Sequence, residues 1–191
     1  LQHARRQADD PAGFQRDADE YKLMGLAPYG NPEKIDLSDF LYYSGDGNYA
    51  LNTAYLYPIP PGQSFPNKQI PLYSKALTDK LKIPEVAAIP HTDFQKDLAA
   101  AAQYQLEKVV TEWLRYWILQ TGIRKVCLAG GVAMNCVLSQ QIAAMPEVEA
   151  LYIPPFAGDQ GISIGNALLA GASEHIAFHP AAFRAYTGRA Y

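Results

Sequence analysis

The chain has 191 residues, of which 49% are hydrophobic and 18% are charged. This length corresponds to one domain, or to one domain and part of another, and the composition is that of a folded globular chain. The net charge of −3 offers no general attraction to nucleic acid or to an anionic membrane. No apolar run reaches the ~18 residues of a membrane span. We therefore expect a cytoplasmic chain that binds neither nucleic acid nor membrane.

The first part of the chain combines a short helix with a β-hairpin. Residues 17–26 have a helical composition, and the Pro and Gly residues that follow end the helix. Residues 40–57 are rich in Tyr, Leu and Thr around Asp46 and Gly47, a dipeptide that predicts a hairpin turn. Five prolines between residues 57 and 71 exclude a regular helix there and predict a connecting loop.

A long helix is predicted for residues 94–120, because apolar side chains recur there at intervals of three and four residues. Gly122 is well placed to end it. The expected apolar stripe includes Trp113 and Trp117, for which core packing is favoured over a ligand platform. Its members are Leu98, Ala101, Ala102, Leu106, Val109, Val110, Trp113, Leu114, Trp117 and Ile118.

The last part of the chain alternates strands and helices. The pattern predicts strands at 125–129 and 150–154 and helices at about 133–145 and 160–174. Such alternation indicates parallel strands with right-handed crossovers, and therefore an α/β fold. Ligands of open α/β sheets bind beyond the carboxyl ends of the strands, so the turns after the two strands are the candidate site.

The first of these turns carries two adjacent glycines, Gly130 and Gly131, between a strand and a helix. Because glycine lacks a Cβ atom, backbone N–H groups can approach an anion closely, and a helix N-terminus favours negative charge by ~0.3–1 kcal/mol. Asn135 offers a donor and an acceptor to a ribose, a base or a phosphate oxygen. The same residues also suit a tight turn without a ligand, and the spacing leaves both interpretations open.

The second turn carries Asp159 among small residues at the start of a helix. One interpretation is a ligand of a divalent metal that bridges nucleotide phosphates. The other is the N-cap of the helix, a position that Asp favours, and on physical grounds alone the cap is preferred. The two roles are compatible, since the rotamer decides which of them the carboxylate fills.

Other metal-binding or reactive patterns are weak. Cys127 and Cys136 fit neither a zinc knuckle nor a redox pair, and we expect them to be reduced and buried. His175 and His179 have the spacing of a helical metal pair, but a position near a helix end explains them better than a metal does. The motifs of serine hydrolases, Walker-type NTPases and zinc proteases are absent from the sequence.

Three segments, in this order, resemble the carbamoyltransferases of nodulation-factor and antibiotic biosynthesis. They are residues 20–30 (EYKLMGLAPYG), 128–136 (LAGGVAMNC) and 153–161 (IPPFAGDQG). Residues 97–103 (DLAAAAQ) also look like the long helix of that family, and the resemblance spans about 19–191.

The resemblance implies an α/β lobe of the actin, sugar kinase and Hsp70 ATPase fold, with a mixed sheet and flanking helices. Residues 1–191 would be the later part of a nucleotide-binding carbamoyl-transfer domain, without the N-terminal part and without the C-terminal adenylate-forming domain. The parent enzyme would make carbamoyl adenylate from ATP and carbamoyl phosphate. It would then pass the carbamoyl group to the hydroxyl of a small-molecule acceptor, and this chain alone would be inactive.

By the same resemblance, Gly130, Gly131 and Asn135 would contact the adenylate, and Asp159 would be a late carboxylate ligand of iron or a similar divalent metal. The family also uses an early His-x-x-x-His pair, which this sequence lacks. Because His175 and His179 follow the glycine turn, that role is not transferred to them. Two alternatives stay open, namely a domain like the tRNA threonylcarbamoyl-transfer proteins and a non-catalytic nucleotide-binding module.

Overall fold

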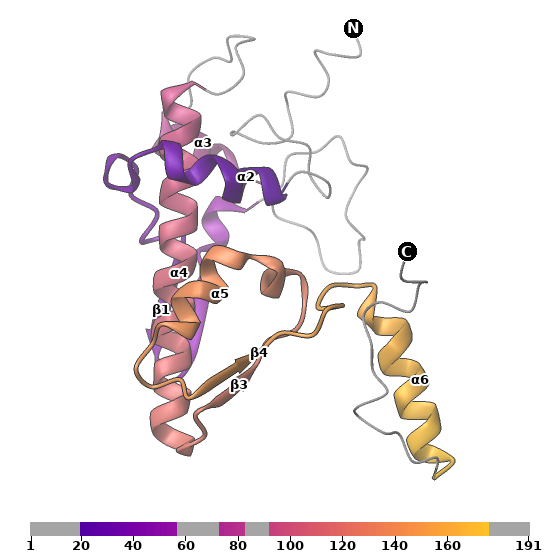
Figure 1. Cartoon of the computed structure of the whole chain (residues 1–191). Coiled ribbons are helices and arrows are strands. Elements are labelled where there is room, and N and C mark those ends of the chain that lie inside the picture. The colour runs from indigo at the N-terminus through magenta and orange to yellow at the C-terminus, as the bar shows by residue number, and fades with distance from the viewer. Residues whose placement is uncertain (1–19, 57–72, 83–91, 176–191) are drawn as a thin grey trace, which may run out of the picture. The chain divides into compact units, whose positions relative to one another are not determined.

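The computed structural model describes residues 20–56, 73–82 and 92–175 (Figure 1). The chain divides into two compact units, Leu1–Gly122 and Ile123–Tyr191. Each unit is described by itself below. The loop predicted for residues 57–71 lies outside the described residues, as does His179.

The first unit begins with a short helix and two 3₁₀ turns. Helix α2 (Glu20–Leu26) confirms the helix predicted there, as far as the described residues reach. It leads directly into the 3₁₀ turn η2 (Ala27–Tyr29), and a second turn, η3 (Pro32–Lys34), follows. Each turn has a proline in one of its first two positions, where the missing N–H costs nothing.

Helix α4 (Asp93–Thr121) is the longest element of the described chain (Figure 1). Thr92 and Gln95 form a capping box at its start, and Gly122 ends it in the left-handed conformation, with φ of 70°. The helix therefore confirms the sequence prediction to within one residue at each end. Several polar side chains are buried along it, which the expected apolar stripe did not include: Gln95, Asp97, Gln103 and Gln105.

The predicted hairpin is present and lies against α4. Strands β1 (Leu41–Gly45) and β2 (Asn48–Leu51) pair antiparallel around the Asp46-Gly47 turn. The indole N–H of Trp117 donates to the carbonyl of Gly47 over 3.1 Å. The ring of Trp113 meets that of Tyr49 edge-on, with the centroids 6.4 Å apart. The two tryptophans thus hold the hairpin, as the packing interpretation predicts, although Trp117 remains partly exposed.

The 3₁₀ turn η4 (Thr53–Tyr55) and helix α3 (Lys75–Leu81) complete the first unit. The Tyr55 hydroxyl donates to Asp39 over 2.6 Å, and Lys80 also donates to that carboxylate. The core of the unit gathers around three buried side chains, two on α4 and one in the loop between η3 and β1. Its members are Leu37, Leu98 and Ala101, with Leu23, Leu26, Ile35, Phe40, Leu81, Phe94 and Ala102 packed against them.

The second unit has the predicted alternation of strand and helix. Strand β3 (Lys125–Cys127) pairs in parallel with β4 (Ala150–Tyr152), and Val126 lies opposite Leu151. The described elements thus form a mixed α/β structure with a parallel pair, and Leu138 and Ile142 are fully buried. Between and after the strands lie three further elements: η5 (Gly131–Met134), α5 (Cys136–Ala143) and α6 (Gly161–Ser173).

One sequence prediction for this unit is wrong in part. Cys127 and Cys136 are not joined in a disulfide, but both are exposed, whereas the sequence analysis expected them to be buried. Cys127 follows the half-buried Val126 in β3, and because successive side chains of a strand point to opposite faces, Cys127 points outward. His175 lies just beyond the end of α6 with φ of 56°, which agrees with the position near a helix end that the sequence analysis preferred to a metal pair. Within the described residues, no helix is long and apolar enough to cross a membrane.

Candidate functional site

Gly130 joins the turn after β3 to the turn after β4. Its backbone, with φ of 96° and ψ of 170°, occupies a region that is essentially restricted to glycine. In this conformation its N–H donates to the carbonyl of Ala157 over 2.7 Å. The amide of Gly130 is therefore used to hold the two turns together and does not itself face an anion.

The amides that follow are better placed to receive one. Gly131 and Val132 are the first two residues of η5, so their N–H groups precede its first internal hydrogen bond, from Ala133 N–H to Gly130 O over 3.1 Å. Both residues are exposed. A Cβ atom built on Gly131 meets nothing within 4 Å. The predicted anion cradle would therefore consist of the amides of Gly131 and Val132, and anion binding there stays a prediction.

Asn135 is the N-cap of α5. Its Oδ1 accepts a hydrogen bond from Leu138 N–H over 3.0 Å, and its side chain is half-buried. The sequence offered Asn135 as both a donor and an acceptor for a nucleotide. The cap uses one of the two acceptor positions of Oδ1, and the amide nitrogen carries the donors that a nucleotide could accept from.

Asp159 does not cap α6, which corrects the preferred sequence interpretation. The N-cap position is Gln160, and no side chain accepts a capping hydrogen bond there. The reason lies in the main chain, because Gly161 N–H already donates to Gly158 O over 2.9 Å and Ile162 N–H to Asp159 O over 3.0 Å. Main-chain carbonyls thus satisfy the amides that a capping carboxylate would take, and the exposed Asp159 side chain is left for another role.

The described residues do not form a metal site by themselves. In residues 20–56, 73–82 and 92–175, no three His, Cys, Asp or Glu side chains gather closely enough to hold an ion. A single exposed carboxylate is a weak ligand, and a bound metal commonly takes several oxygen or nitrogen ligands. Asp159 would therefore need ligands from outside the described part of the chain.

The two turns lie side by side, as the parallel strands predict. The Gly130–Ala157 hydrogen bond links them through the backbone. A second contact is made by Met134, whose Sδ would lie 2.9 Å from a Cβ atom built on Gly158. The residues that follow these contacts are Asn135 and Asp159, so the structure brings together the turns that carry them. The binding of a nucleotide or a metal there stays a prediction.

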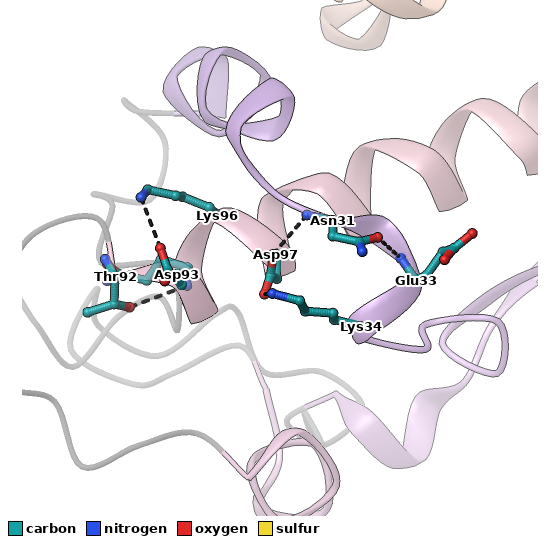
Figure 2. A network of polar contacts seen from close by, with 8 residues as sticks. Asn31, Glu33, Lys34, Thr92, Asp93, Lys96 and Asp97 are labelled. Carbon is teal, nitrogen blue, oxygen red and sulfur yellow. Dashed lines mark hydrogen bonds and ion pairs between the residues drawn. The ribbon is translucent and has the colours of Figure 1, made fainter.

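A second polar centre, at Asp97 on α4, was missed by the sequence interpretation. Asp97 is buried, and its carboxylate accepts from Asn31 N–H over 2.8 Å and pairs with Lys34 Nζ at 3.0 Å (Figure 2). These contacts, with the Asn31 amide first and the Lys34 ammonium second, lower the pKa of Asp97. The sequence feature that could have indicated this centre is Asp97 itself, an acidic residue at the start of an otherwise apolar run.

Gly30 shows how closely this loop approaches the helix. A Cβ atom on Gly30 would lie 2.6 Å from the amide nitrogen of Asp97 and still closer to the carbonyl of Lys96. Backbone atoms cannot yield as the end of a side chain can, so glycine is required here for the close approach. The loop that follows α2 is therefore fixed on the first turns of α4.

Comparison with known proteins identifies the family. The model described as the carbamoyltransferase N-terminus matches residues 2–168. Most of the chain is covered by this match, including the glycine turn and the Asp159 turn. The chain therefore belongs to the carbamoyltransferase N-terminal family, as its three sequence segments indicated.

The matches to three relatives extend over most of this chain but over less than half of each relative's own length. The chain is 37% identical over 158 residues to the uncharacterized protein sll1178 of Synechocystis sp., covering 82% of this chain and 25% of the relative. It is 31% identical over 153 residues to the nodulation protein NolO of Bradyrhizobium diazoefficiens, covering 79% and 25%. A tRNA N6-adenosine threonylcarbamoyltransferase of Bordetella avium is 30% identical over 165 residues, covering 77% and 41%. The chain thus spans about a quarter of the length of the first two.

Proposed function

We propose that this chain is the later part of the actin-like, nucleotide-binding transfer domain of an ATP-dependent O-carbamoyltransferase. In that reaction the oxygen of an acceptor hydroxyl forms a bond to the carbamoyl carbon of carbamoyl adenylate. The bond from that carbon to AMP breaks, and the hydroxyl proton leaves. Carbamoyl phosphate and ATP supply the adenylate, which suits a cytoplasmic enzyme.

One observation carries the proposal: the hydrogen bond between Gly130 and Ala157 joins the two turns at the carboxyl ends of paired parallel strands. That edge is where open α/β sheets bind ligands. Membership of the carbamoyltransferase family then indicates the chemical class of the ligand.

The residues at this edge take distinct roles in the proposal. The amides of Gly131 and Val132 receive phosphate oxygens, as orphan amides at a helical turn do. Asn135 contributes the donors of its amide nitrogen. Asp159 binds a divalent metal together with ligands from other parts of the parent protein. A metal held there would neutralise phosphate charge.

Gly131→Ala in the full-length parent protein tests the nucleotide site. A Cβ atom on Gly131 meets nothing within 4 Å, so a methyl group there does not clash with the described residues, and in the proposed site it would compete for space with the phosphate. We expect at least about tenfold weaker ADP binding by calorimetry and a smaller thermal stabilisation by ADP. The melting temperature without ligand should change little.

Gly25→Ala is the matched control. Gly25 lies in α2, where a Cβ atom also meets nothing within 4 Å, and it is outside the proposed site. This variant should bind ADP as the wild type does. Equal ADP affinity of the Gly131→Ala protein and the wild type would contradict the assignment of the cradle.

A second candidate is transfer of a threonylcarbamoyl group to tRNA, which the similarity to the Bordetella avium enzyme favours. The net charge of −3 argues against it, because tRNA binding depends on neutralising phosphates. Labelled tRNA at modest salt separates the two candidates. Binding of tRNA that weakens steeply as the salt concentration rises would support the tRNA function. An O-carbamoyltransferase should bind no tRNA.

A further inference from the structure

We propose that Met134 is a positioning residue that fixes the separation between the glycine turn and the Asp159 turn. The inference rests on the proposed function, because it assigns Met134 a role in the same nucleotide site. Met134 lies within the segment 128–136, but the sequence analysis gives this residue no role. The partner of Met134 in this role is Gly158.

The contact between Met134 and Gly158 is specific in its geometry. A Cβ atom on Gly158 would lie 2.9 Å from Met134 Sδ and 2.7 Å from Gln160 Oε1, so the glycine is enclosed on two sides. Met134 belongs to η5 and Gly158 to the turn after β4, which makes this a link between two segments far apart in sequence. The thioether is soft and adaptable, so it fills such a gap well.

The location of the contact gives it a functional meaning. Met134 directly precedes Asn135, and Gly158 directly precedes Asp159. The backbone hydrogen bond from Gly130 to Ala157 also links the turns. The Met134 contact lies several residues beyond that hydrogen bond, and two separated contacts restrict the rotation of one turn against the other more than the hydrogen bond does by itself. The distance from the amide cradle to the Asp159 carboxylate therefore depends on Met134.

Stability alone explains Met134 poorly. Its side chain is 60% exposed, so most of its apolar surface contributes little to the hydrophobic core. Replacing it should therefore change the unfolding free energy little while loosening the two turns. That difference separates a positioning role from a purely structural one.

The test uses the full-length parent protein with ADP and Mg²⁺, and Met134→Ala as the variant. We expect ADP to bind about three- to tenfold more weakly, with an unchanged melting temperature in the absence of ligand. Met134→Leu, which conserves side-chain volume, should restore ADP affinity to within about twofold of the wild type. Leu169→Ala removes an exposed apolar side chain from α6, away from the turns, and should leave affinity unchanged.

A double-mutant cycle decides whether Met134 acts through the Asp159 turn. Met134→Ala and Asp159→Asn should be non-additive by at least about twofold in ADP affinity, the lower limit for coupled residues. Additive losses, with each single variant still weakened, would overturn the positioning role and leave the proposed nucleotide site intact. Wild-type protein that binds no ADP would overturn both proposals.

Discussion

Asp97 shows how one buried carboxylate organises a loop. Both of its oxygens are used, one by the Asn31 amide and one by the Lys34 ammonium (Figure 2). Asn31 in turn accepts from Glu33 N–H over 2.9 Å, which starts η3. A buried charge is tolerated only when it is paired and hydrogen-bonded. Asp97 meets both conditions, and the loop cannot leave α4 without exposing it.

The stability contributed by Asp97 should depend on pH in a defined direction. Its folded-state pKa lies below the ordinary value of 3.8, because the Asn31 amide and Lys34 favour the charged form. The contribution is therefore fully present above the unfolded-state pKa and is lost as the pH falls through the lower folded-state pKa. Urea unfolding of the wild type and of Asp97→Asn at pH values from 7 to about 2 measures it.

The wild type should be more stable than Asp97→Asn near neutral pH, and the difference should shrink once the pH drops below about 4. Comparison of the two proteins cancels the other carboxylates, including Asp36 and Asp39, whose pKa values are also lowered. A difference in unfolding free energy that stays constant over this range would show that Asp97 does not act through its charge.

Single residues were the least predictable level of this structure. The sequence placed Asp159 at a helix start, but main-chain hydrogen bonds there left no amide for it to cap. The predicted burial of the cysteines was also wrong. Cysteine is buried on average, but this average does not determine which face of a particular short strand is covered. The surroundings of a single side chain depend on contacts between distant segments, and a local sequence pattern carries no information about those contacts.

At the scale of elements, the hairpin and α4 stabilise each other. Gly47 has φ of 73° and leaves no room for a Cβ atom beside the rings of Tyr116 and Trp117. Its N–H donates to the Tyr43 hydroxyl and its carbonyl accepts from Trp117. The turn therefore depends on the helix for one of these two hydrogen bonds as well as for its packing.

Trp117→Phe should destabilise the first unit by about 0.5–1.5 kcal/mol, the usual contribution of one hydrogen bond. The ring remains, but Gly47 loses the indole donor. Trp113→Phe is the control, since it retains an aromatic ring against Tyr49 on the same helix. Denaturant unfolding followed by circular dichroism measures both variants. A greater loss in Trp113→Phe would show that packing outweighs the hydrogen bond at this contact.

Elements were predicted well because their signals are local. The apolar spacing and the terminal Gly122 of α4, the Asp-Gly turn and the alternating last segment are all patterns of neighbouring residues. Asp97 and Gly30 were not found as a pair, since they lie far apart in sequence and meet only through the fold. The approach of the two candidate turns was predictable, because parallel pairing fixes which strand ends are neighbours.

At the scale of the whole chain, each unit has buried apolar side chains of its own. Leu37, Leu98 and Ala101 form a cluster in the first unit. Leu138 and Ile142 are the largest fully buried side chains, and both belong to the second unit. Because cooperative unfolding follows compact units with their own cores, two units need not unfold together.

The distribution of natural probes makes this testable. Both tryptophans, Trp113 and Trp117, lie in the first unit, and both cysteines lie in the second. In a Cys136→Ala protein, a fluorinated tag on the exposed Cys127 reports on the second unit, while tryptophan fluorescence reports on the first. We expect two different urea midpoints for the 191-residue chain. Coincident transitions would show instead that the two units unfold as one cooperative structure.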